Sequence, residues 1–504
     1  MKVVSQCREQ AKRVYHGAVF EIKKEIPTND RNLQRCFHTA DNTMTKPDYS
    51  VLVAQQREFF LSGATRPDSW RKAQLEAVKA LFTENHDELC DALWKDLRRN
   101  VTDADLMDVA YCAKEADYAL GHLAVWMEPH RAPMPLVFEP GHIRVRRDPL
   151  GVTLIIGAWN EPFMLTFGPL TAALAAGNTA VLKPSEVAAS CAAAAARLVP
   201  KYFDPRAVAV VEGAVPETTA LLEQQWDFIF FTGSPPVGKI IHQAAAKHLT
   251  PCVLELGGKN PTIVHSSAKL KVSARRIAYG RFMNSGHICT APDHVLVWPE
   301  VKDEFVGHLI ESIREFYGDD PQKSPDYGRV INRRNFDRLV GLIGSGKIAT
   351  GGKTDAAELY IAPTVLLDVS LDSPIMQEEV FGPILPVLEI ESVEAVIKWV
   401  NERPSPLGLY VFAEDADVVE RILDATSSGD AEVNDCAIHP LFPELPFGGV
   451  GNSGMGKYHG RWGFEAFTNA RGVLYHSAKL DPGVRYPPYT KHTLERRITS
   501  ALTP

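Results

Sequence analysis

The spacing of apolar residues changes character twice along the chain. Residues 1 to about 45 mix charged and turn-forming residues without sustained periodicity, which predicts an appended, weakly ordered segment. From Tyr49 to Trp126, apolar residues recur every three or four positions, as in WRKAQLEAVKALFTENHDELCDALWKDL. This period predicts a set of amphipathic helices at the start of the folded part.

After Gly151 the pattern alternates between apolar strands and helices. The runs VTLIIGAW, TAVLK, AVAVVEG and DFIFFTG are apolar on both faces, and helical segments separate them. Strands of this kind are typical of a parallel sheet covered by helices on both sides, so the sequence predicts a doubly wound nucleotide-binding domain. Beyond PCVLELGG the alternation resumes through PTIVH, SARRIAYGRF and HVLVW, which predicts a second α/β domain.

The segment HIRVRRDP alternates like an exposed strand, and the stretch from about 438 to 480 is rich in Gly, Pro and aromatic residues. Unpaired strand edges of that kind are often covered by another subunit. The predicted division is 1–46 as an N-terminal extension, 47–127 with 150–254 as the NAD(P)-binding domain, 128–149 with 438–485 as a bridging and dimerisation region, 255–437 as the catalytic domain, and 486–504 as a C-terminal tail.

Composition narrows the class of protein. The 504 residues include 54 Lys and Arg against 62 Asp and Glu, and no long single-sign block argues for nucleic acid or an anionic membrane. The 8 cysteines are scattered without C-x-x-C pairs, which favours a reduced, cytoplasmic protein and predicts no metal site. No apolar run reaches the roughly 18 residues that a transmembrane helix needs, so a soluble chain is expected.

Three residues are candidates for the chemistry. Cys289, in NSGHICTAPDH, follows a predicted helix and could be a nucleophile or an inert core residue. Glu255, in the apolar strand LELGGKN, could be a general base with a raised pKa or the partner of Lys259 in a buried salt bridge. Asn160 ends the first parallel strand, where its amide could stabilise an oxyanion or simply form a turn before Pro162.

Two further segments could contact a dinucleotide. The loop GSPPVG connects a strand to a helix whose first backbone N–H groups could hold phosphate, although it lacks the usual G-x-G-x-x-G pattern. Lys183 and Glu186, in LKPSE, could bind ribose hydroxyls or could form an exposed surface pair. Each signal is weak alone.

Taken in order, these segments resemble the aldehyde dehydrogenase superfamily, and most closely its class 3 branch. The resemblance covers roughly residues 47 to 480 and rests on PLGVTLIIGAWNEP, AALAAGNTAVLKPSE, FIFFTGSPPVGK, LELGGKNP, GHICTAPD, QEEVFGPILPV and LPFGGVGNSGMGKYHG. It implies two doubly wound α/β domains with a small bridging region. It also implies a homodimer and NAD or NADP as cofactor.

The resemblance assigns roles to individual residues. Cys289 would be the nucleophile, Glu255 the general base, and Asn160, with the backbone N–H of Cys289, the oxyanion site. The residues expected to contact the cofactor are Trp159, Lys183, Glu186, Gly233, Ser234, Pro235, Pro236, Val237, Gly238, Glu379 and Phe381. The implied reaction passes through a thiohemiacetal and a thioester on the cysteine, which water activated by the glutamate then hydrolyses.

Three positions depart from the usual class 3 residues. Glu161 replaces an aromatic residue, His287 replaces Gln, and His294 replaces Tyr. The first two are candidates for the substrate pocket, and the charge of Glu161 should disfavour acidic aldehydes. The class implies apolar aliphatic, aromatic or apocarotenoid aldehydes without selecting among them.

Two other functions are compatible with these residues. Coenzyme A could accept the acyl group in place of water, although Glu255 favours hydrolysis. Alternatively, the chain could be a non-catalytic protein on the same fold, although the joint presence of Cys289, Glu255, Asn160 and Glu379 argues against it.

Overall fold

The computed structural model describes residues 47–135, 138–479, 481 and 485–488. The predicted N-terminal extension and most of the predicted C-terminal tail lie outside the described residues. Residues from Pro47 onward form one compact unit. Its first elements are the helices α3 (Ser50–Leu61), α4 (Asp68–Glu84), α5 (His86–Leu97), α6 (Val101–Met107) and α7 (Val109–Met127).

A six-stranded sheet follows these helices, in the order β17-β7-β6-β3-β4-β5. Its strands are β3 (Val152–Ile156), β4 (Thr179–Lys183), β5 (Val208–Val210), β6 (Phe228–Gly233), β7 (Cys252–Leu256) and β17 (Gly454–Met455). All are parallel except β17, which pairs antiparallel with β7. The associated helices are α8 (Met164–Ala176), α9 (Ala189–Tyr202), α10 (Val215–Leu222), α11 (Pro235–Ala246) and α18 (Gly460–Ala466).

Both faces of this sheet are buried, as the apolar runs predict. Along β3, Val152, Leu154 and Ile156 pack into a core that includes residues of α3, α10 and α11. Ile155, which points the other way, packs into the core formed with α4, α5 and α7 to α9. Burial on both faces explains why these strands lack the alternation of half-exposed strands.

The second sheet has seven strands in the order β10-β13-β14-β9-β8-β15-β16. They are β8 (Pro261–Val264), β9 (His294–Val297), β10 (Lys347–Thr350), β13 (Thr364–Leu367), β14 (Ile384–Glu389), β15 (Gly408–Phe412) and β16 (Asp430–Val433). Its helices are α12 (Leu270–Phe282), α13 (Lys302–Tyr317), α14 (Arg333–Ile343), α15 (Pro374–Gln377), α16 (Val393–Asn401) and α17 (Ala416–Ala425). A small hairpin consists of β11 (Thr354–Asp355) and β12 (Tyr360–Ile361).

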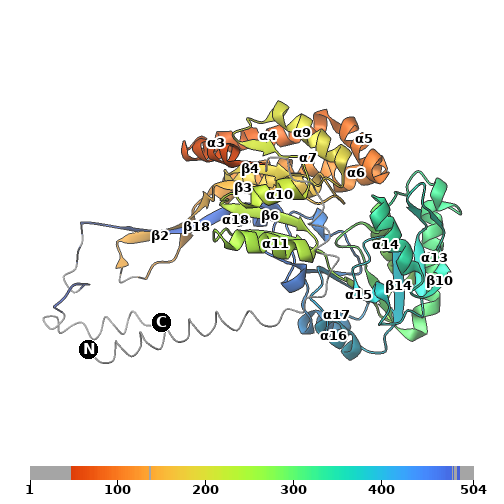
Figure 1. Cartoon of the computed structure of the whole chain (residues 1–504). Helices are drawn as coiled ribbons and strands as arrows, with labels where there is room; N and C mark the ends of the chain where they lie inside the picture. Colours follow the sequence, from red (N-terminus) through yellow and green to blue (C-terminus); the bar gives the residue numbers. More distant parts are fainter. Residues whose placement is uncertain (1–46, 136–137, 480, 482–484, 489–504) are drawn as a thin grey trace, which may run out of the picture. The chain divides into compact units, whose positions relative to one another are not determined.

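A third sheet joins segments that are far apart in sequence. β2 (Gly141–Pro149) pairs antiparallel with β18 (Thr468–His476) along all nine residues, and the short β1 (His130–Ala132) lies on the other side of β2 (Figure 1). HIRVRRDP is therefore a strand, as predicted. The second edge of β18 has no strand partner among the described residues.

Candidate active site

The candidate residues Asn160, Lys183 and Gly233 all lie at one edge of the first sheet. Asn160 follows β3, Lys183 is the last residue of β4, and Gly233 is the last residue of β6. Because β3, β4 and β6 are parallel, their carboxyl ends meet at this edge, where open α/β sheets bind ligands. A chain that folds in this way places the predicted oxyanion and cofactor residues side by side.

Cys289 lies in a turn and not directly at a helix end. α12 ends at Phe282, and Asn284 and Ser285 then adopt left-handed backbone angles with φ of 49° and 52°. The amide of Asn260 donates to the carbonyl of Cys289 at 2.7 Å, which fixes the turn against the start of β8. Burial raises the pKa of the Cys289 thiol, and the carboxyl groups of Glu161, Glu379 and Glu255 raise it further. The fold thus surrounds one thiol with three acidic side chains.

Glu255 lies on β7 and is 3% exposed. Neither of its carboxylate oxygens makes a hydrogen bond of normal geometry among the described residues. Burial raises its pKa well above the ordinary value, an effect that Lys457 and the N–H of Gly449 only partly oppose. A carboxyl group of this kind is suited to act as a base near neutral pH.

The alternative interpretation of Glu255, as the salt-bridge partner of Lys259, is wrong. Lys259 instead contacts Asp293 at 2.5 Å and donates to the carbonyls of Ile375 and Glu378. The carboxylate of Glu255 is therefore not used by that lysine.

The position of Asn160 is fixed through its backbone. The guanidinium of Arg99 and the amide of Asn284 both donate to the Asn160 carbonyl, the latter at 2.9 Å. Its side-chain amide is left to face Glu161, with 3.3 Å between Nδ2 and Oε2. The amide thus points into the space that Glu161 also occupies.

Glu161 lies in a pocket that also contains Cys289. The pocket is mainly apolar and is lined by Leu106, Met107, Glu161, Met164, Leu165, Tyr279, Met283, Ile288, Cys289, Thr290, Ala437, Ile438, Pro440, Leu441, Phe447 and Tyr458. Burial raises the pKa of Glu161 to about 8, against the opposing effect of Arg99. The side chain is therefore mostly protonated near pH 7, which limits the charge effect predicted for it.

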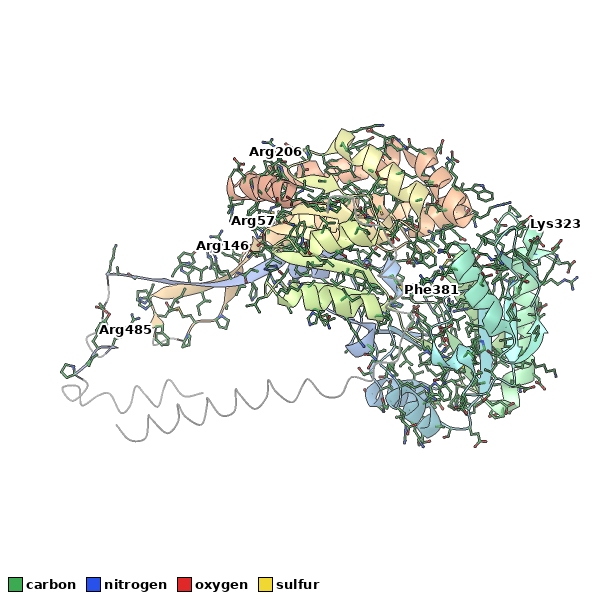
Figure 2. The ribbon with its side chains drawn as sticks, in the orientation of Figure 1. Arg57, Arg146, Arg206, Lys323, Phe381 and Arg485 are labelled. Atoms are coloured by element: carbon green, nitrogen blue, oxygen red, sulfur yellow. The ribbon has the colours of Figure 1, made fainter. Side chains whose placement is uncertain are left out.

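His287 packs against two residues predicted to contact the cofactor. Its ring centroid lies 5.2 Å from that of Trp159 and 6.1 Å from that of Phe381, and the latter two rings are 5.3 Å apart (Phe381 is labelled in Figure 2). Burial lowers the pKa of His287 to about 3, so the imidazole is neutral. The residues that line the apolar pocket do not include His287. The third departure, His294, is also buried and accepts from the indole of Trp399 at 3.0 Å.

The segment that carries Glu379 and Phe381 is held on several sides. Asp293 accepts from the N–H of Val380 at 2.8 Å, and Arg338 donates to the Val380 carbonyl at 2.8 Å. The guanidinium of Arg281 donates to the carbonyl of Gly382. These contacts place Phe381 against Trp159 and the Glu379 carboxyl group against Gly257.

The sheet edge also fits part of a dinucleotide. Lys183 is 1% exposed, donates to the carbonyl of Pro184 at 2.7 Å and lies 3.5 Å from the carboxylate of the half-exposed Glu186. A buried ammonium next to an accessible carboxylate matches the hydroxyl groups of a ribose. The first turn of α11 offers fewer phosphate donors than usual, because Pro235 and Pro236 have no N–H. Gly238 has a packing reason as well, since a Cβ there would lie 2.6 Å from Leu256.

Several residues of the site carry no clear signal in the sequence. Tyr458 is buried with an unpaired hydroxyl, and its pKa is raised by burial and by Glu255, Cys289 and Glu161. It belongs to the quoted segment KYHG, but its position near the thiol follows only from the fold. Arg99 lies 61 positions before Asn160, so no local pattern links them.

This arrangement of sheets, thiol and carboxyl groups matches one known family. The chain belongs to the aldehyde dehydrogenase family, whose model matches residues 23–473. The predicted family, fold and enzyme class are confirmed.

Individual relatives agree with this assignment. The chain is 46% identical over 441 residues to "Aldehyde dehydrogenase, dimeric NADP-preferring" of Mus musculus, covering 87% of this chain and 97% of the relative. It is 46% identical over 446 residues to "Aldehyde dehydrogenase family 3 member B1" of Homo sapiens, covering 88% and 95%. A solved structure, the substrate-bound state of Staphylococcus aureus AldH, superposes with a TM-score of 0.89 at 39% identity and covers 91% of this chain and 100% of that one.

The names of these relatives agree with the predicted class 3 branch and with NAD or NADP as cofactor. In the described part of the chain, no helix combines the length and apolar character that a membrane crossing requires.

Proposed function

We propose that this chain oxidises an aldehyde to a carboxylic acid with NAD or NADP, through a thiohemiacetal and then a thioester on Cys289. The observation that carries the proposal is the setting of Cys289, which lines an apolar pocket with Glu161 and lies close enough to the buried carboxyl group of Glu255 for that group to raise the pKa of its thiol. The amide of Asn160 faces Glu161 at 3.3 Å and could serve the same pocket. The family and the relatives support the same chemistry.

Each residue has a part in this reaction. The Cys289 thiol gives up its proton to solvent, and its sulfur attacks the aldehyde carbon, turning the carbonyl oxygen into an oxyanion that the amide of Asn160 and the N–H of Cys289 stabilise. Glu255 then takes a proton from the water that hydrolyses the thioester. Its unpaired oxygens and raised pKa support that role.

The nicotinamide cofactor, when bound, would accept the hydride, and the positive charge of its oxidised ring would favour the thiolate. Lys183 and Glu186 would hold its ribose, while Gly233, Ser234 and Val237 would lie at its phosphates. Trp159, Glu379 and Phe381 would hold its nicotinamide end, with the neutral ring of His287 packed behind two of them.

The apolar lining of the pocket supports apolar aliphatic, aromatic or apocarotenoid aldehydes as substrates. The described cysteines are all free thiols, as a cytoplasmic enzyme with a catalytic cysteine requires. The relative from Mus musculus is named dimeric, which supports a homodimer. The open edge of β18 is the interface that we propose for it.

The direct test is a panel of aldehydes assayed for reduced cofactor with NAD and with NADP, using Cys289→Ala as the blank. We expect turnover that depends on the cysteine and releases free acid in the same yield with or without coenzyme A. Turnover by Cys289→Ala would overturn the proposal, and formation of an acyl thioester of coenzyme A would replace hydrolysis by acylation.

A further inference from the structure

Three side chains of different chemistry meet between α5 and α6, apart from the site described above. His86 and Cys90 are four positions apart on α5 and therefore lie on the same face of the helix. Asp105 reaches them from α6. One ligand atom from each lies within 4.8 Å of the others, and no other trio of potential metal ligands meets this closely in the described part of the chain.

The spacing of these atoms is close to that of a tetrahedral metal site. With metal bonds of about 2.0 Å to nitrogen and 2.3 Å to sulfur, the two ligands should be separated by roughly 3.5 Å. His86 Nε2 lies 3.8 Å from Cys90 Sγ and 2.8 Å from Asp105 Oδ1. Between Nε2 and Oδ1, admitting an ion requires the carboxylate to move away by about half an ångström, and the side chain of Asp105 is 37% exposed. The third separation, from Cys90 Sγ to the carboxylate, is below 4.8 Å.

A second carboxylate orients the imidazole. Asp87 Oδ1 lies 2.9 Å from His86 Nδ1, on the side of the ring away from Cys90. A carboxylate that holds the Nδ1 proton leaves the Nε2 lone pair for a metal, which is the usual arrangement around metal-bound histidines. The partial exposure of His86 and Asp105 gives an ion a route from solvent and leaves a fourth position for water.

The local charge also favours a cation. The carboxylates of Asp87 and Asp105 lie 2.9 and 2.8 Å from the two ring nitrogens of His86, so negative charge is concentrated beside the Cys90 sulfur. The same negative potential that opposes a free thiolate attracts a divalent ion, and the bound ion would in turn stabilise the thiolate.

We propose that His86, Cys90 and Asp105 bind one divalent transition-metal ion of the zinc type and thereby fasten α5 to α6. On binding, the metal–sulfur bond forms as the S–H bond of Cys90 breaks, and the proton passes to solvent without any change of oxidation state. The spacing of cysteines along the sequence predicts no metal site, because the third ligand comes from a different helix.

The loop that this ion would brace also supports the active site. Arg99 lies between α5 and α6, and its guanidinium donates to the carbonyl of Asn160. The metal would therefore stabilise the segment that positions the oxyanion amide, without contacting the reacting atoms.

The test is a titration of the full chain carrying Cys289→Ala with Co²⁺, followed by equilibrium dialysis and by absorption of the cobalt–thiolate band. The Cys289→Ala substitution removes the reactive thiol, which could otherwise bind Co²⁺ and add to the thiolate band. We expect one equivalent of Co²⁺ with a thiolate band, which disappears when Cys90→Ser is added. Adding Asp87→Asn should weaken binding by about tenfold or more.

Cys252→Ser is the matched control, because Cys252 also faces a histidine, with 3.4 Å to His242 Nδ1, but forms no three-ligand group. In that background the band should be unchanged. Zn²⁺ should raise the melting temperature of the Cys289→Ala protein but not that of the version with Cys90→Ser. The absence of a thiolate band, or a band that persists in Cys90→Ser, would overturn the proposal.

Discussion

Burial keeps Glu161 and Glu379 largely protonated near pH 7, because the pKa of each is raised to about 8. Both carboxyl groups, together with that of Glu255, raise the pKa of the Cys289 thiol. If all three were ionised, their combined repulsion would strongly oppose a thiolate. Their neutral forms therefore matter for the nucleophile as much as for any proton that they transfer.

Replacing Glu255 with Gln should separate the two halves of the reaction. Acylation needs the thiol but not the base, so Glu255→Gln should release about one equivalent of reduced cofactor per site and then stall. Rapid-mixing absorbance measurements would show a burst followed by a turnover rate about a hundredfold or more below that of the wild type.

Glu115→Gln is the control, because Glu115 is also buried but accepts from the N–H of Gly460 and is not among the carboxyl groups that raise the pKa of Cys289. This variant should show neither the burst nor the stall. Steady turnover of Glu255→Gln at the wild-type rate would remove Glu255 from the mechanism.

The charge of Glu161 should affect selectivity only above its pKa of about 8. At pH 6.5 the protonated side chain should tolerate an acidic aldehyde, whereas at pH 9 the carboxylate should repel it. We expect the ratio of kcat/KM for a neutral over an acidic aldehyde of similar size to rise about tenfold, equivalent to about 1.4 kcal/mol. In Glu161→Gln the ratio should stay constant with pH, and a rise of equal size in that variant would exclude this role.

Stability gives a second measure of the same group. Because the pKa of Glu161 is higher in the folded chain than its ordinary value of 4.5, the folded state retains a proton that the unfolded state loses as pH rises. Glu161 therefore lowers stability progressively between about pH 4.5 and pH 8. The melting temperature of Glu161→Gln minus that of the wild type should therefore increase as the pH rises across this window.

At the scale of elements, the connection between α6 and α8 supports the site. Asp108, between α6 and α7, accepts from the N–H groups of Phe163 and Met164 at the start of α8 and pairs with the buried Arg99. Arg99 in turn donates to the carbonyl of Asn160. One carboxylate thus caps a helix and holds the cation that positions Asn160, the proposed oxyanion residue.

Asp108→Ala should leave the Arg99 guanidinium buried without its counter-charge. Loss of one partner of a buried pair costs about 3–5 kcal/mol, so the melting temperature should fall strongly. The kcat of the molecules that remain folded should also fall, because Arg99 would no longer hold Asn160 in place. Asp117→Ala, which removes an exposed partner of Lys79, should leave the stability almost unchanged, because water and salt screen an exposed ion pair. Equal effects of the two substitutions, measured by chemical denaturation, would show that the buried pair has no special weight.

The spacing of apolar residues predicted the strands and helices whose formation depends mainly on neighbouring residues in the sequence. β3, β4 and β6 are continuous apolar runs because both faces of the sheet are buried, and the alternation with helices indicated their parallel order. Other features depend on contacts between distant segments. No local pattern indicates the left-handed backbone of Asn284 and Ser285. The strand β17 has two residues, too few to be predicted before they pair with β7.

The same limit applies to the candidate site. Cys289, Glu255 and Asn160 were predicted as site residues because each lies in a segment that resembles the family. Tyr458 and Arg99 were missed, since each reaches the site from a remote segment. The sequence also placed His287 with the substrate, whereas its packing against Trp159 and Phe381 follows from the fold.

At the scale of the whole molecule, β2 and β18 form a ribbon whose outer edge has no strand partner among the described residues (Figure 1). Along β18 the side chains of Leu474 and Tyr475 are 60% and 39% exposed. An open edge that carries apolar side chains is prone to pair with another chain. In the proposed homodimer, the second subunit would pair with this edge.

We therefore expect a dimer by light scattering at micromolar concentration and a shift toward monomer in Leu474→Glu, because a carboxylate would have to be buried at the interface. Leu371→Glu is the control, since Leu371 is 48% exposed but lies far from the ribbon in sequence, between β13 and α15. It should remain dimeric. A wild-type monomer would refute the homodimer itself, whereas a dimer unaffected by Leu474→Glu would keep the homodimer but place its interface away from this part of β18.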